Sequence, residues 1–123
     1  MDKTRLGISV VAAVLVIQTL AGLVWSSTPE LTAIGLVFNA VAAVSLVLFA
    51  RRGSAAWVVV GWCAAFFGWH VTGLGALAGW WTTGLEAVFL VGGTQLSLIY
   101  QAVLATGCGF AVHLLLPPRT SAS

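Results

Sequence analysis

The sequence predicts an all-α membrane protein: a transmembrane four-helix up-down bundle, formed as a single domain over residues 1–123. The first observation is composition, because 60% of the 123 residues are hydrophobic and only 7% are charged. Soluble domains carry about 25% charged residues, and a soluble fold of this size lacks the polar surface to cover so many apolar side chains. The second observation is four apolar runs, each close to the roughly 20 residues that cross a hydrocarbon core of about 30 Å.

Helix-breaking or polar residues separate the four runs. Between the first two, Ser27 or Thr28 suits the N-cap position and Pro29 suits the first helical position. The stretch 51–54, "RRGS", separates the second and third runs, and the two prolines at 117–118 end the fourth. The predicted transmembrane helices are about 6–25, 31–50, 56–77 and 96–116.

The stretch 78–95 between the third and fourth helices is too long for a tight turn and too short to cross a bilayer. Trp80 and Trp81 stand near its start, and Gly92 and Gly93 near its end. Tryptophan is enriched at membrane–water interfaces. We therefore expect an interfacial or partly re-entrant segment here.

The distribution of basic residues predicts the orientation in the membrane. Four crossings place every basic residue on one side: Lys3, Arg5, Arg51, Arg52 and Arg119. The other two connections contain Glu30 and Glu86 and no basic residue. The positive-inside rule then predicts a multi-pass protein of the cell membrane with both termini in the cytoplasm. A signal peptide is the alternative for the first run, but that run exceeds the usual 7–15 apolar residues.

The third predicted helix carries a small-residue stripe, with steps of four and three that place its members on one face. The stripe consists of Gly61, Ala65, Gly68, Thr72, Gly75 and Gly79. In lipid, small residues let helix backbones approach closely, so we expect another helix to cross here. Packing within the chain is the preferred interpretation. A homo-oligomer or a membrane protein partner, packed through the Gly61/Gly68/Gly75/Gly79 face, is the alternative.

Each predicted helix also carries one strongly polar residue at depth. Counted at 1.5 Å per residue, all four lie within about 7 Å of the bilayer midplane, on its outer side. They are Gln18, Asn39, His70 and Gln101, which we call the polar layer. An unsatisfied amide or imidazole in hydrocarbon costs several kcal/mol. We therefore expect the polar layer to turn inward, toward the axis of the bundle.

The polar layer has two interpretations. One is interhelical hydrogen bonding alone, which fixes the register of the helices. The other is a ligand-binding pocket that opens toward the outer face, because intramembrane ionisable residues mark functional sites. The predicted binding residues are the polar layer together with Trp69, Tyr100 and Glu86. We expect Glu86 to be a solvated interfacial carboxylate, with a position folded back toward His70 as the alternative.

Several other classes of site find no support in the spacing of the residues. His113 lies about 10 Å to the inner side of the midplane, too far from the level of His70 for both to ligate one haem. Cys63 and Cys108 are expected to be apolar fillers of the core. We therefore predict no cofactor and no metal. The net charge of +2 indicates no nucleic-acid partner.

These observations predict a small, non-enzymatic integral membrane protein whose main partner is the lipid bilayer. It would bind a small or lipid-like ligand in the outer-leaflet pocket, or serve as an accessory subunit of a membrane complex. The alternative is a compact membrane enzyme or a proton-coupled transporter that uses His70. A carboxylate in the first two helices would favour a proton-coupled exporter, and the first helix carries Gln18 instead.

Overall fold

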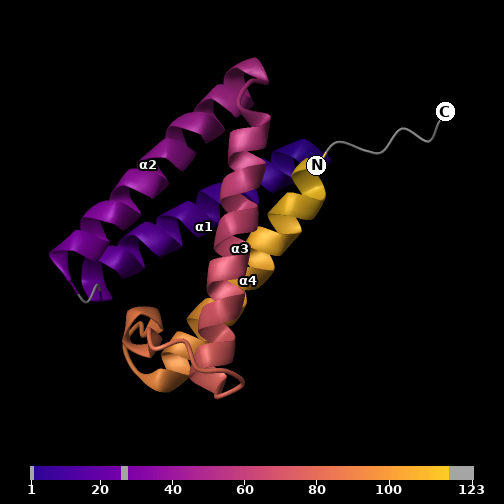
Figure 1. The fold of residues 1–123 in the computed structure, drawn as a ribbon. Coiled ribbons are helices and arrows are strands. Elements are labelled where there is room, and N and C mark those ends of the chain that lie inside the picture. The colour runs from indigo at the N-terminus through magenta and orange to yellow at the C-terminus, as the bar shows by residue number, and fades with distance from the viewer. Residues whose placement is uncertain (1, 26–27, 117–123) are drawn as a thin grey trace.

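The computed structural model describes residues 2–25 and 28–116, and within them the fold is all-α (Figure 1). Four helices run in sequence, with one 3₁₀ helix before the last. Each of the four α-helices is long and apolar enough to cross a membrane, so the predicted four-helix fold is confirmed. The elements are α1 (Lys3–Trp25), α2 (Pro29–Arg52), α3 (Ala56–Ala78), η1 (Glu86–Phe89) and α4 (Thr94–Leu115).

Local sequence explains where α2 begins and ends. The hydroxyl of Thr28 accepts a hydrogen bond from the backbone N–H of Leu31 at 3.2 Å, and Pro29 follows as the first helical residue. At the other end, Gly53 takes a left-handed conformation with φ of 68° and donates its N–H to the carbonyl of Phe49. Ser27, the other predicted cap, lies outside the described residues.

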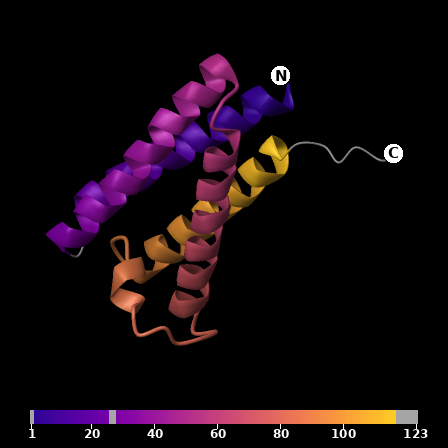
Figure 2. The same cartoon turned by 45° about the horizontal axis from the view of Figure 1, so that its top comes forward.

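The helices form two antiparallel pairs that are joined at one end (Figure 1). Helix α4 packs against both α3 and α1, while α2 has the least extensive packing of the four. Helices α2 and α3 meet at their connection and diverge toward the opposite end, where η1 lies (Figures 1 and 2).

A compact apolar core occupies the half of the bundle near the α2–α3 connection. Val11 of α1, Val59 of α3 and Leu104 of α4 are each at most 1% exposed there. Cys63 and Cys108 are free thiols buried in the same cluster. They therefore serve as small apolar side chains within the packed core.

The small-residue stripe on α3 does not receive another helix, so the prediction of close packing within the chain is wrong. A Cβ atom added at Gly61 or Gly68 would meet nothing within 4 Å, and Gly75 is covered by the ring of Trp81. Helix α3 instead faces the bundle with larger side chains, such as Trp62 and His70, which are both buried. Regular spacing predicts a common face but does not identify which face the neighbouring helices cover.

The glycines that a facing helix covers lie between α1 and α4 instead. A Cβ atom at Gly7 would lie 2.6 Å from Leu115, and one at Gly107 would lie 2.9 Å from Val14. A side chain added at either position would therefore force a neighbouring side chain of the facing helix to shift.

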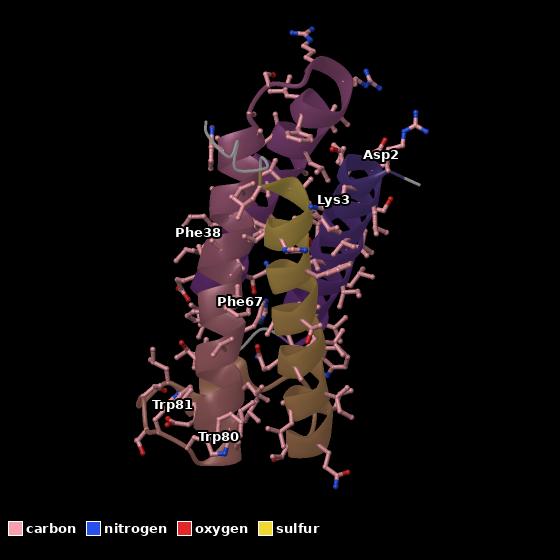
Figure 3. All side chains as sticks on the ribbon, turned by 90° about the vertical axis from the view of Figure 1, so that its right-hand side faces the viewer. Asp2, Lys3, Phe38, Phe67, Trp80 and Trp81 are labelled. Carbon is pink, nitrogen blue, oxygen red and sulfur yellow. The ribbon has the colours of Figure 1, made fainter. Side chains whose placement is uncertain are left out.

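The two ends of the bundle differ in composition. Asp2 and Lys3 lie at one end, and Trp80 and Trp81 lie at the other (Figure 3). Arg51 and Arg52 close α2 at the same end as Lys3, because α1 and α2 run antiparallel. Arg119 lies outside the described residues. The described basic residues thus gather at one end, and the direction of that end in the membrane stays a prediction.

Candidate functional site

His70 lies at the centre of the polar layer and is only 2% exposed. Its ring nitrogen Nδ1 is 2.6 Å from Oε1 of Gln101, which belongs to α4. Its other ring nitrogen, Nε2, is 2.8 Å from Oε1 of Gln18, which belongs to α1. One imidazole thus connects three helices.

The hydrogen bonds continue from Gln18 to α2. The amide nitrogen of Gln18 donates to Oδ1 of Asn39 at 2.8 Å. The amide nitrogen of Asn39 donates in turn to the hydroxyl of Thr19 at 3.1 Å. The four side chains that the sequence predicted to converge therefore form one connected network, with one member from each helix.

The Gln101 amide fixes the proton on one side of His70. The amide nitrogen of Gln101 donates to the carbonyl of Phe89 at 2.9 Å, so its oxygen faces the imidazole. Nδ1 of His70 must then carry a hydrogen, because an amide oxygen only accepts. A neutral imidazole has one N–H, which leaves Nε2 as an acceptor.

On the other side of His70, the hydrogen-bond chain can run in two directions. When Nε2 is protonated as well as Nδ1, the imidazole is cationic and Nε2 donates to the Gln18 oxygen, with the chain continuing through Asn39 to Thr19. A bare Nε2 requires the amides of Gln18 and Asn39 to be turned over, with Thr19 as the donor at the far end. Amides and hydroxyls can both donate and accept, so either direction is fully bonded. In both directions the amides of Gln18 and Asn39 each keep one N–H that bonds to no residue the structure describes.

The end of η1 and the two residues that follow it pack over the polar layer. Phe89 is 1% exposed and packs directly on Gly73 of α3, where an added Cβ atom would come within 2.5 Å of its ring. The Phe89 ring also contacts Trp69, with centroids 4.7 Å apart. Buried Ser97 accepts from the N–H of Val91 at 2.6 Å. Together with the Gln101–Phe89 bond, these contacts hold residues 89–91 against α3 and α4.

A cavity of about 280 Å³ lies between the polar layer and this segment. Its polar wall consists of Gln18, Thr19, Asn39, His70, Tyr100 and Gln101. Its other walls are mainly apolar and include Ile34 and Phe38 of α2, Phe66 and Trp69 of α3, and Val88, Leu90 and Val91. Among the described residues, no aspartate, glutamate, lysine or arginine lines the cavity.

The open side of the cavity, its mouth, is bordered by lining side chains that are exposed, among them residues of α2 and α3. Ile34 and Phe38 of α2 line the cavity and are 52% and 53% exposed, and Trp69 of α3 lines it and is 39% exposed. Phe38 and Phe66 meet edge to face, with centroids 6.5 Å apart, and so join α2 to α3. Apolar side chains thus surround the opening.

Two further predicted binding residues, Trp69 and Tyr100, also line the cavity. The Tyr100 ring stands edge-on to His70, with centroids 5.9 Å apart. No hydrogen bond joins its hydroxyl to any residue that the structure describes. Tyr100 therefore adds an unused donor to the polar wall.

Glu86, the seventh predicted binding residue, does not line the cavity. Its carboxylate accepts from the backbone N–H of Thr83 at 3.0 Å. This bond lowers the pKa of Glu86 below its ordinary value of 4.5, because it stabilises the charged form. Glu86 thus orders the connection before η1, and the alternative of contact with His70 is not observed.

Sequence reasoning did not identify the apolar walls of the cavity. Phe38, Phe66, Val88 and Leu90 resemble the many other apolar residues of the chain, so composition carries no signal for them. Thr19 accepts a hydrogen bond from Asn39, and its position directly after Gln18 in the sequence is a signal for this role. The docking of Phe89 depends on a helix–loop contact, for which the only hint in the sequence is the glycine at position 73.

In the residues 2–25 and 28–116, no group of three or more histidine, cysteine, aspartate or glutamate side chains is placed to hold a metal ion. Comparison with protein-family models, curated proteins and solved structures finds no significant match to this chain.

Proposed function

We propose that this protein binds a small, lipid-like molecule that reaches the cavity from the outer leaflet of the membrane. The observation that carries this proposal is a cavity with one polar wall and otherwise mainly apolar walls, set in a bundle whose four helices are long and apolar enough to cross a membrane. Ligand pockets have this character, with mostly apolar lining and a few converging polar groups. A layer that served only for packing would leave no such space.

The position of the mouth supports access from the bilayer rather than from water. Ile34, Phe38 and Trp69 are exposed at the opening, and their apolar side chains suit contact with lipid chains. The polar wall lies deeper, so a molecule with a polar head and an apolar tail can satisfy both regions. In this arrangement the head reaches the polar layer and the tail remains at the mouth.

Photolabelling of the purified protein in phosphatidylcholine nanodiscs tests this proposal. The probe is a monoacylglycerol with a photoreactive diazirine in its chain, and labelled peptides are identified by mass spectrometry. Labelling is expected to concentrate on peptides that contain residues 31–39 and 66–70. Unlabelled monoacylglycerol is expected to compete with it.

Two matched glycine variants make the test specific. Gly35 lines the cavity and has open space around its Cβ position, so Gly35→Phe fills the cavity. Gly61 has the same open surroundings but lies outside the cavity, which makes Gly61→Phe the control. Labelling should fall about tenfold in Gly35→Phe, the change that 1.4 kcal/mol represents, and stay constant in Gly61→Phe. Uniform labelling of all lipid-facing helices, unchanged in Gly35→Phe, would overturn the proposal.

A further inference from the structure

The chemistry of the cavity narrows the class of molecule that it binds, and this step rests on the function proposed above. We infer that the ligand is an amphiphile with an uncharged, flat ring that carries carbonyl oxygens, such as an alkylated quinone. Three features of the cavity support this class: its charge, its hydrogen-bonding groups and its shape.

The lack of charged lining residues argues for an uncharged head. No described aspartate, glutamate, lysine or arginine lines the cavity, so a cationic head group would meet no counter-ion there, and an anionic one would meet a counter-ion only in the doubly protonated form of His70. An unpaired charge at this depth in a bilayer is costly. His70 already contacts Gln101 and Gln18 with its two ring nitrogens, which leaves neither nitrogen free for an ionic head.

The unused hydrogen-bonding groups of the polar wall are mainly donors. Gln18 and Asn39 each use one N–H within the network, and each amide nitrogen carries two. Tyr100 adds a hydroxyl without a partner among the described residues. A head group that satisfies these donors must offer acceptors. Carbonyl oxygens on a ring do this without bringing a donor that would remain unpaired.

Size and shape favour a ring over a bulky head. The volume of about 280 Å³ is just below the range of roughly 300–1,000 Å³ that is typical of small-molecule pockets. This space is too small for a whole two-chain lipid, so the tail must leave through the mouth. Aromatic side chains from all four helices line the cavity: Trp25, Phe38, Phe66, Trp69 and Tyr100. Aromatic rings pack well against another flat ring, stacked or edge to face.

Displacement of the photoreactive monoacylglycerol by a matched set of decyl compounds tests the inference. The set contains a decyl-benzoquinone that is fully substituted on the ring, decylbenzene, decyl sulfate and decyltrimethylammonium. The quinone is expected to displace the probe at a concentration at least about tenfold below the other three. Equal displacement by decylbenzene would overturn the role of the carbonyl groups, and equal displacement by either ionic compound would overturn the uncharged head.

The result also separates this inference from the proposed function. If unlabelled monoacylglycerol competes and the quinone does not, the cavity binds amphiphiles and only the ring class is wrong. If no compound competes, both the proposed function and the inference about the ring fail.

Tyr100→Phe supplies a second readout. It removes a hydroxyl without a described partner, so the stability of the protein should not change. We expect displacement of the probe by the quinone to weaken about three- to tenfold, because one hydrogen bond is lost. An unchanged affinity would mean that the Tyr100 hydroxyl does not donate to the quinone.

Discussion

Nδ1 of His70 lies 2.6 Å from Oε1 of Gln101, and the same glutamine donates to the carbonyl of Phe89. The amide of Gln101 thus connects the imidazole of α3 to residues 89–91, which precede α4. Through Gln101, the polar layer is linked to the part of the cavity wall that these residues form. The stability of the bundle and the shape of the cavity therefore depend on the same residues.

Removal of the imidazole should destabilise the fold. His70→Ala breaks two hydrogen bonds and leaves the amides of Gln18 and Gln101 without their partner on α3. We expect the free energy of unfolding to fall by about 1–3 kcal/mol, measured by titration with a denaturing detergent in mixed micelles. Thr72→Ala is the control on the same helix, since that exposed hydroxyl bonds only to the carbonyl of Gly68 in its own helix. Equal stability of the two variants would contradict a connected polar layer.

The contact between Gly73 and Phe89 should tolerate no added methyl group. Gly73→Ala places a Cβ atom within 2.5 Å of the Phe89 ring, so either the ring or the segment must shift. We expect a loss of about 1–3 kcal/mol and faster amide hydrogen exchange over residues 86–91. Gly68→Ala has open space and should be neutral or slightly stabilising, because alanine favours helix. Unchanged exchange over 86–91 in Gly73→Ala would show that the segment is not held by this contact.

The orientation predicted from the basic residues can be tested by cysteine labelling in whole cells. Thr82 and Ser54 are exposed and lie in the connections at opposite ends of the bundle. A membrane-impermeant maleimide should label Thr82→Cys in intact cells, and Ser54→Cys only after permeabilisation. The native Cys63 and Cys108 are buried and should stay unlabelled. The reverse pattern would place the basic end outside.

The titration of Glu86 should report the hydrogen bond that orders the connection before η1. Because the folded pKa is lowered, the bond to Thr83 contributes stability above the ordinary value of 4.5, and this contribution is lost as the pH falls through the folded value. Carbon-13 NMR of the carboxyl in detergent micelles should show a midpoint below 4.5. A midpoint at or above that value would mean that the Thr83 N–H does not hold the carboxylate.

The sequence alone was sufficient for the fold and for the polar half of the site. Length and apolarity predict the four crossings, and the cost of an unpaired amide in lipid predicts that Gln18, Asn39, His70 and Gln101 converge. These predictions succeed because lipid penalises polar groups so strongly. The face of α3 that receives its neighbours was predicted wrongly, since Gly61 and Gly68 are uncovered while a facing helix covers Gly7 and Gly107. In an apolar chain, packing preferences differ little from one face to the next.

The most direct test of this account is a double-mutant cycle between Gln18 and His70, which are far apart in sequence and belong to α1 and α3. Unfolding free energies are measured for the parent protein, Gln18→Ala, His70→Ala and the double variant in the same mixed micelles. If the two side chains are hydrogen-bonded inside the bundle, the coupling energy should be about 0.5–2 kcal/mol. Additive effects, with a coupling energy indistinguishable from zero, would mean that the polar side chains do not meet and that the cavity has no polar wall.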